Sequence, residues 1–283
     1  MDKGLSGPPS VISRQAIFAA NRAVGRIALT VAAGRHRSCR TRLHEAGSLR
    51  MRFPHGSGEV LDAVIVNIAG GMTGGDRFDI DVEVGDGAKL RVTTAAAEKI
   101  YRSLGPDSEV GVKLDVGRGG SLAWLPQETI LFDRARLRRR IEVDLAGDAN
   151  LLIAETGVFG RSAMGETVAS GFFSDRWRVR VDGALVFADS IRLDGGIAGR
   201  LEERAIAAGG AAAASVLKRP GNEANVAAVR ALERDFIGEV GVSAWNGLVV
   251  VRCVAADGAA LRHDLIGVLT ALGAGPLPRL WSN

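Results

Sequence analysis

The chain has 283 residues, of which 47% are hydrophobic and 5% aromatic, and 36 basic against 32 acidic residues give a net charge of +4. This length suits one large all-β domain or two ordinary domains, and the mixed charge argues against a surface dedicated to nucleic acid. Gly is abundant and Pro is scarce, which predicts many short strands joined by turns.

The cellular compartment is predicted from three features. The amino-terminal segment lacks a basic start followed by an uninterrupted apolar core, so we expect no export signal. The longest apolar run, Ala205 to Leu217, is shorter than the roughly 20 residues that span a bilayer. The two cysteines, Cys39 and Cys253, are far apart in the sequence, as is typical of a reducing compartment. We therefore predict a cytoplasmic protein without a membrane segment.

Strands are predicted for most of the chain after an irregular start over residues 1–20. Apolar and polar residues alternate, and pairs of Gly punctuate the strand-like segments between residues 60 and 191. Helical periodicity is absent from that region. The clearest predicted strands are Arg26–Val31, Leu49–Phe53, Ala63–Ile68, Phe78–Val84, Lys89–Thr94 and Val110–Val116.

A weak repeat with a period of about 30 residues runs through this region. Its copies begin at Asp81, Lys113 and Glu142, and each consists of a strand, a Gly-containing turn and a second strand. A shortened fourth copy begins at Arg178. Such units cannot bury their apolar faces singly, so the repeat predicts a mainly β fold, either a stacked β-sandwich or a β-superhelix. Convergent hairpin sequences are the alternative explanation.

The carboxy-terminal part changes to mixed structure. Apolar spacing predicts two helices, at about Glu223–Gly238 and Ala259–Leu272, and an apolar strand between them at Leu248–Val254. No linker demands a domain boundary. We predict a single domain over residues 1–283, in which residues 221–283 pack a strand and two helices on the β body.

The Gly-rich stretch Gly70–Asp76 has the composition of a phosphate-binding loop but not its pattern. It lacks the Lys-Ser/Thr ending of a P-loop and the spacing of a dinucleotide fingerprint, and a predicted strand follows it. We interpret it as a tight turn whose glycines allow close packing of the backbone.

A second candidate, His36, Cys39 and His44, has side chains that bind nickel or zinc. Arginines that would repel a cation surround these residues. They are Arg35, Arg37, Arg40 and Arg42. The segment is better interpreted as a solvated basic face.

Hydrolase chemistry is not indicated, because no Gly-x-Ser-x-Gly elbow occurs and no His has the context of a catalytic triad. The basic run Arg134–Arg140 is predicted to span a hairpin. It either forms a solvated edge that resists strand pairing or docks an acidic partner.

Carboxylates inside apolar or Gly-rich segments are the remaining candidates. Their burial costs free energy unless they are paired, hydrogen-bonded or metal-bound. Each taken alone is explained as a turn cap or an edge charge, whereas the set would suit a polar path for a divalent cation. The set comprises Asp76, Glu98, Glu128, Asp133, Glu155, Glu166 and Asp194.

Five segments, in this order along the chain, resemble the signature blocks of the UreD/UreH family of urease accessory proteins, and the resemblance covers about residues 22 to 282. The segments are Asn67–Asp76, Thr93–Ser103, Trp124–Asp133, Glu155 with Gly160–Glu166, and Pro278–Trp281. One departure is Ile68-Ala69, where many relatives carry Pro-Pro.

This resemblance implies a mainly β, non-catalytic protein that bridges apo-urease and UreF, which in turn recruits the nickel-carrying GTPase UreG. We expect no tightly bound cofactor and Ni(II) only in transit, since compact His/Cys cages would hold the ion too firmly for transfer. The positions expected to touch the ion are Asp76, Glu98, Glu128, Asp133, Glu166 and Asp194.

Two other functions stay open from the sequence. A β-helical scaffold for iron–sulfur cluster assembly would show similar repeats, although two separated cysteines supply few cluster ligands. An enzyme with its pocket at the Gly70–Asp76 turn is the third hypothesis.

Overall fold

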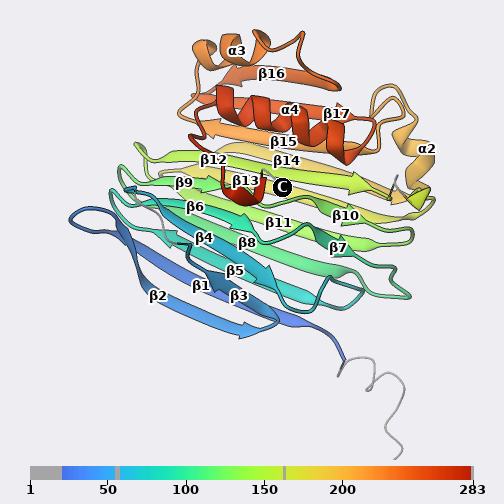
Figure 1. The fold of residues 1–283 in the computed structure, drawn as a ribbon, viewed down its shortest axis with the longest axis horizontal. Helices are drawn as coiled ribbons and strands as arrows, with labels where there is room; N and C mark the ends of the chain where they lie inside the picture. Colours follow the sequence, from blue (N-terminus) through green and yellow to red (C-terminus); the bar gives the residue numbers. More distant parts are fainter. Residues whose placement is uncertain (1–20, 55–57, 162–163, 282–283) are drawn as a thin grey trace, which may run out of the picture.

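The structure is a computed structural model that describes residues 21–54, 58–161 and 164–281. The predicted irregular segment 1–20 lies outside the described residues. The strands of the described part form a seven-stranded sheet and a ten-stranded sheet, here called sheet A and sheet B (Figure 1).

Sheet A has the strand order β14-β13-β11-β8-β5-β1-β2. Its strands are β1 (Val24–Ala33), β2 (Ser38–Gly47), β5 (Arg77–Val84), β8 (Ser108–Val116), β11 (Arg136–Leu145), β13 (Gly171–Val181) and β14 (Ala184–Gly195).

Sheet B has the order β16-β17-β15-β12-β9-β6-β4-β3, and two short strands, β7 (Glu98–Ile100) and β10 (Thr129–Leu131), continue from β12 beside this path. Its other strands are β3 (Leu49–Arg52), β4 (Leu61–Asn67), β6 (Lys89–Thr94), β9 (Ser121–Trp124), β12 (Asn150–Phe159), β15 (Ala212–Arg219), β16 (Glu239–Trp245) and β17 (Leu248–Ala255).

The predicted repeat is confirmed as the rung of a β-superhelix. Parallel pairing in sheet A aligns Asp81 with Lys113, Lys113 with Glu142 and Glu142 with Arg178, the first residues of the four copies. Each of the first three copies passes from a sheet A strand to a sheet B strand, where the parallel ladder continues from β6 to β9 and β12. The fourth copy instead turns back at Asp182-Gly183, where both residues have positive φ, and forms the antiparallel hairpin β13–β14. The stack of rungs therefore ends there.

The main core fills the space between the two sheets, as the alternation in the sequence requires. Ile80, Val112 and Ile141 lie side by side in sheet A and point inward, and all three are buried. Every second residue of these strands faces outward instead. The outer face of sheet A is therefore charged, whereas its inner face is mostly apolar.

The prediction of a hairpin with a solvated edge at Arg134–Arg140 is wrong. Arg134 adopts a positive φ of 59° in a turn, and the rest of the run begins β11, which lies between β8 and β13 in the middle of sheet A. Parallel pairing on both sides protects this strand from edge pairing. Its alternation turns Arg136, Arg138 and Arg140 outward and Arg139 inward.

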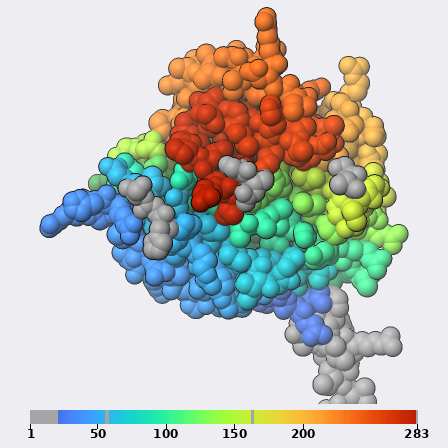
Figure 2. Space-filling view, in the orientation of Figure 1, coloured from blue at the N-terminus to red at the C-terminus, as the bar shows by residue number. Residues whose placement is uncertain are grey.

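The carboxy-terminal elements cover one end of sheet B and build a second core against β15 and β17. The helices of this part are α3 (Glu223–Arg230) and α4 (Gly258–Ala271), with a 3-10 turn η2 (Arg279–Trp281). Figure 2 shows these residues, in orange and red, forming a lobe on the β body. A further helix, α2 (Ile197–Leu201), contacts β14 and contributes to the main core. The strand predicted at Leu248–Val254 and the second predicted helix are confirmed, and α3 is shorter than predicted. None of the described helices is long and apolar enough to cross a membrane.

Candidate functional site

An ionic cluster lies between the sheets, formed by Arg139 of β11, Glu155 of β12 and Asp175 of β13. One guanidinium nitrogen of Arg139, Nη1, donates to the Glu155 carboxylate, and the other, Nη2, donates to Asp175 Oδ2 at 2.5 Å. Glu155 also accepts a hydrogen bond from Trp124 Nε1 at 2.8 Å. All three charged residues are buried, each with 5% of its surface exposed. We call them the Arg139 cluster.

Burial and charge act in opposite directions within the Arg139 cluster. Burial raises the pKa of Glu155, and the Arg139 charge offsets part of that rise. The two carboxylates raise the pKa of Arg139 and keep it protonated, despite the opposing effect of burial. In the part of the chain that the structure describes, Arg139 Nε and Asp175 Oδ1 are buried without a hydrogen-bond partner. The cluster therefore retains unused donor and acceptor capacity.

Two hollows meet at the Arg139 cluster, one between the sheets and one that opens at the surface beside exposed residues such as Arg192 and Arg252. An inner cavity of about 70 Å³ extends toward the Gly-rich turn and is lined by Met72, Thr94, Glu98 and Gln127, among others. A larger hollow of about 410 Å³ lies between the ends of β13–β14 and β15–β17. Arg139 and Glu155 line both spaces, so this ion pair forms the wall between them.

Glu98 is the acidic residue at the other end of the inner cavity. Its two carboxylate oxygens accept hydrogen bonds from Asn67 Nδ2 at 2.9 and 3.1 Å. Burial raises its pKa to about 7, and the nearby Asp76 carboxylate adds to the rise. Glu98 therefore exchanges its proton near neutral pH, and its side-chain partner is a neutral amide.

Asp76 holds the Gly-rich turn in place through hydrogen bonds to the backbone. It is buried, and its two oxygens accept from the backbone N–H groups of Ala23 and Thr73, both at 2.8 Å. The tight-turn interpretation of Gly70–Asp76 is confirmed, because a Cβ at Gly74 would lie 2.4 Å from the carbonyl oxygen of Pro106. A strand, β5, follows the turn as predicted.

The other predicted carboxylates are paired with arginines. Glu128 pairs with Arg262 at 2.6 Å and Glu166 with Arg161 at 2.5 Å. Asp194 is exposed on the outer face of sheet A and pairs with Arg192 at 2.8 Å. Glu128, Arg262 and Arg161 line one surface hollow, whereas the pair Asp194–Arg192 lies elsewhere, on the outer face of sheet A.

Asp133 contacts another of the predicted residues directly, as Glu98 does through its backbone N–H, which donates to the Glu128 carbonyl oxygen at 2.8 Å. The Asp133 backbone N–H donates to Glu166 Oε1 at 3.5 Å, and the Asp133 carboxylate accepts from Ser170 N at 3.2 Å and lies 3.6 Å from Arg134. The structure therefore joins Asp133 to Glu166 and Glu98 to Glu128, and it places Asp76 near Glu98. Asp194 lies apart on the outer face of sheet A.

No tight metal cage exists among residues 21–54, 58–161 and 164–281, because no three His, Cys, Asp or Glu side chains gather there. His36, Cys39 and His44 are exposed at or beside the edge strand β2, in agreement with a solvated basic face. Sequence reasoning missed Arg139 and Asp175. It named Glu155 among the carboxylates that would suit an ion path but left it out of the six positions expected to touch the ion. The alternation Leu137-Arg138-Arg139-Arg140-Ile141 carried the signal, since it places an arginine at an inward position.

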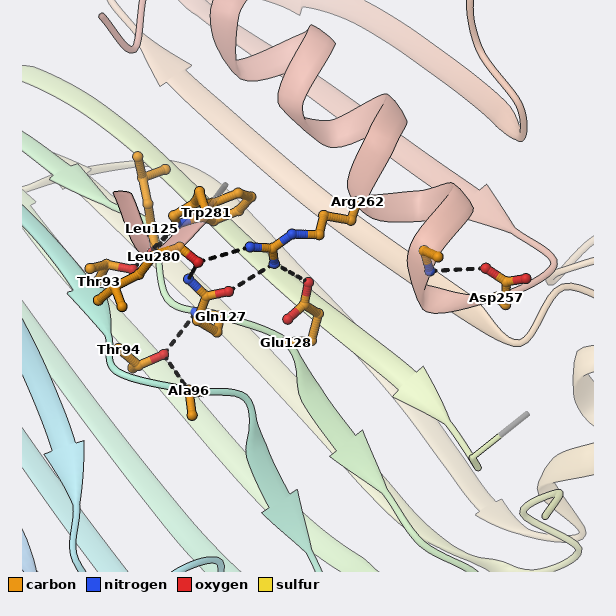
Figure 3. Close-up of polar contacts among 11 residues, drawn as sticks. Thr93, Thr94, Ala96, Leu125, Gln127, Glu128, Asp257, Arg262, Leu280 and Trp281 are labelled. Carbon is orange, nitrogen blue, oxygen red and sulfur yellow. Dashed lines mark hydrogen bonds and ion pairs between the residues drawn. The ribbon is translucent and has the colours of Figure 1, made fainter. Parts of the chain in front are cut away.

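A third hollow, of about 720 Å³, opens on the surface where α4 meets the β body. Arg262 of α4 reaches across this junction, and its Nη1 donates to Gln127 Oε1 at 2.8 Å and to Glu128 Oε1 at 2.6 Å (Figure 3). Its Nη2 donates to the Leu280 carbonyl oxygen at 3.0 Å. Gln127 also lines the inner cavity, so it separates that cavity from the surface hollow.

Trp281 fixes the end of the chain to the same junction. Its Nε1 donates to Thr93 Oγ1 at 3.3 Å and to the Leu125 carbonyl oxygen at 3.1 Å, and the Arg262 guanidinium lies 5.2 Å from its ring centroid (Figure 3). The terminal block noted in the sequence thus ties the carboxy-terminal lobe to the superhelix.

We expect Arg262→Ala to destabilise this junction by about 1 to 3 kcal/mol, because Glu128 loses its cation and Leu280 loses a donor. Amide hydrogen exchange should accelerate at residues 279–281 while β8 and β11 keep their protection. Arg279→Ala, at the start of η2, serves as the matched control. Equal exchange in the two variants would contradict the role assigned to Arg262.

The fold and the site together define a β-superhelical protein whose mostly apolar interior holds one buried ionic cluster, with isolated carboxylates in place of a metal cage among the described residues. The UreD urease accessory protein model matches residues 23–282. The chain belongs to the UreD family of urease accessory proteins.

Curated relatives agree with this assignment over nearly the whole length. A urease accessory protein UreD of Rhodopseudomonas palustris (strain BisA53) is 53% identical over 274 residues, which cover 97% of this chain and 96% of that protein. Another, from Bradyrhizobium diazoefficiens, is 51% identical over 267 residues, which cover 94% and 96%. Their names describe an accessory role, in agreement with the prediction that the chain is not an enzyme.

Proposed function

We propose that the chain acts in the cytoplasm as a scaffold of urease maturation, linking apo-urease to UreF and through UreF to UreG, and assisting the delivery of Ni(II) to the urease active site. Membership of the UreD family supports the accessory role. The observation that supports ion delivery is the line of hollows inside the superhelix, with Glu98 and the Arg139 cluster at its polar points.

Ni(II) is cargo in this proposal, so its binding must be weak enough for release. Isolated carboxylates and backbone carbonyls hold first-row divalent ions less firmly than assembled imidazole and thiolate ligands. Glu98 has the best position among the candidates because it lines the inner cavity and its side-chain partner, Asn67, is neutral. Asp76, Glu128, Asp133, Glu166 and Asp194 remain candidates for contacts at the turns and at the surface.

The two other hypotheses lack support of this kind. An iron–sulfur scaffold needs clustered ligands, whereas Cys39 lies exposed on β2 of sheet A and Cys253 lies buried on β17 of sheet B. Burial also raises the pKa of the Cys253 thiol to about 12, which keeps it from acting as a thiolate ligand. The Gly70–Asp76 turn is filled by its own packing contacts.

Co-expression with the urease subunits and UreF tests the scaffold. We expect a stable complex that contains this chain, and we expect charge-neutral variants of the six candidate carboxylates to lower urease activation while the complex still assembles. Failure to associate with both apo-urease and UreF would overturn the proposal. Turnover of a substrate by the isolated chain would favour the enzyme hypothesis instead.

A further inference from the structure

The outer face of sheet A carries an unusual density of arginines over β11, β13 and β14. Strand alternation turns seven of them outward, and the strand register places them on neighbouring strands. Arg138 and Arg192 flank Ser174 in one row, and Arg140 lies directly beside Arg176 in the next. The two others, Arg178 and Arg180, lie beside Glu142 and Asp144 of β11. We call the remaining five the arginine patch, and it comprises Arg136, Arg138, Arg140, Arg176 and Arg192.

Three of the five arginines of the patch are held in place by their surroundings. Asp107 accepts from Arg136 and Arg138, both at 2.8 Å. Phe172 points to the same outer face yet is only 2% exposed, because the guanidinium groups of Arg136, Arg138 and Arg192 lie 5.0, 5.0 and 5.3 Å from its ring centroid. These cations are therefore already ordered before any ligand arrives.

The charges of the other two arginines of the patch are not compensated by a direct partner among the described residues. Arg140 and Arg176 are exposed and directly opposite each other, and neither has an ion pair or hydrogen bond to any residue that the structure describes. Like charges directly opposite each other on neighbouring strands are destabilising. An anionic partner would remove this repulsion.

We infer that the arginine patch is a docking surface for an acidic protein surface, and this inference rests on the proposed scaffold function. Guanidinium groups match carboxylates through paired hydrogen bonds. Neighbouring strands lie about 4.8 Å apart and alternate residues of one strand about 6.7 Å apart, so the partner presents carboxylates at similar intervals.

The charges around the patch define the partner further. Glu109 lies beside Arg138, and Asp194 beside Arg192, so a continuous phosphate backbone would meet carboxylates at the rim. Beyond them β5 and β8 turn Asp79, Asp81 and Asp115 to the same outer face, where each pairs with a cation, namely Arg77, Arg26 and Lys113. The unpaired positive charge of this face therefore lies at the arginine patch, which attracts an acidic partner to that end of sheet A.

The test is the double variant Arg140→Glu with Arg176→Glu, co-expressed with the urease subunits and UreF. The control is Arg42→Glu with Arg234→Glu, which makes the same change in charge at two exposed arginines away from the patch. We expect the amount of one partner that co-purifies with the patch variant to fall about tenfold or more, while the control retains both partners. Unchanged thermal unfolding of both variants shows that each is folded.

Three results would overturn the inference. The first is that the patch variant retains both partners. The second is that the unaltered complex is equally stable in low salt and in about 0.5 M salt. The third is that the patch variant differs from the control only in its binding of a short duplex DNA. If the unaltered chain captures neither partner, the proposed function fails and this inference with it. If it captures both and the patch variant does too, only this inference fails.

Discussion

Replacing Arg139 with Met should destabilise the protein by about 3 to 5 kcal/mol, the cost of leaving buried charges without their partner. The variant keeps an unbranched side chain at an inward position, but Glu155 and Asp175 lose the cation that both contact. Urea unfolding followed by circular dichroism measures the loss. The loss in the free energy of unfolding should become smaller as the pH falls toward 5, because an unpaired buried carboxyl accepts a proton more readily there.

The adjacent residue provides a matched control for this experiment. Arg140→Met removes an arginine from the same strand, but its side chain faces outward and is unpaired among the described residues. We expect the free energy of unfolding to change by at most about 0.5 kcal/mol. Neutralising all three members, with Arg139→Met, Glu155→Gln and Asp175→Asn, should recover much of the loss. Equal stability of the Arg139→Met and Arg140→Met variants would contradict the role of the cluster.

Glu98→Gln should instead stabilise the protein above neutral pH. The pKa of Glu98 is about 7 in the folded state against an ordinary value of 4.5, so the folded chain binds more protons between these values. Folding stability is therefore lost as the pH rises from about 4.5 to about 7 and stays constant above, by linkage. The amide carries no charge and can still accept from Asn67 through its Oε1.

We expect the Glu98→Gln variant to be more stable than the unaltered chain by about 1 to 2 kcal/mol at pH 8, a discounted value because Glu98 is only partly buried. At pH 4 the two should be equally stable. Glu142→Gln, on the exposed outer face of β11, should show no such difference between the two pH values. A stability gap that is the same at pH 4 and pH 8 would contradict the assigned pKa.

The repeat was predictable because each rung carries its own alternation and its own Gly turn. Strand β6 begins and ends at the predicted residues, since Lys89–Thr94 is bounded by turns on both sides. Strand β2 was missed because it is an edge strand with few buried positions, and its polar sequence therefore gave no alternation.

Long-range contacts explain what could not be predicted. The apolar spacing of Leu232 and Phe236 continues the pattern of α3, yet the helix ends at Arg230. The buried Asp264 of α4 accepts from the backbone N–H groups of Ile237 and Gly238, both at 2.8 Å, and holds this segment outside a helix at the start of β16.

Long-range contacts also explain why part of the candidate site could not be predicted from the sequence. Arg139 and Asp175 are 36 residues apart and meet only because β11 and β13 pair in parallel. Glu98 was found from the sequence because a carboxylate stood in an apolar segment. Its cavity and its raised pKa depend on residues from several rungs.

Urease activation by the Glu98→Gln variant tests the central claim most directly. Apo-urease is matured with the unaltered chain, the Glu98→Gln variant or the Glu142→Gln variant, each together with UreF and UreG, and both its nickel content and the composition of the co-purified complex are measured. An interior path without tight binding predicts an intact complex in every case and lower nickel content with Glu98→Gln alone. Normal nickel loading by Glu98→Gln, and by variants that neutralise all six candidate carboxylates together, would contradict it.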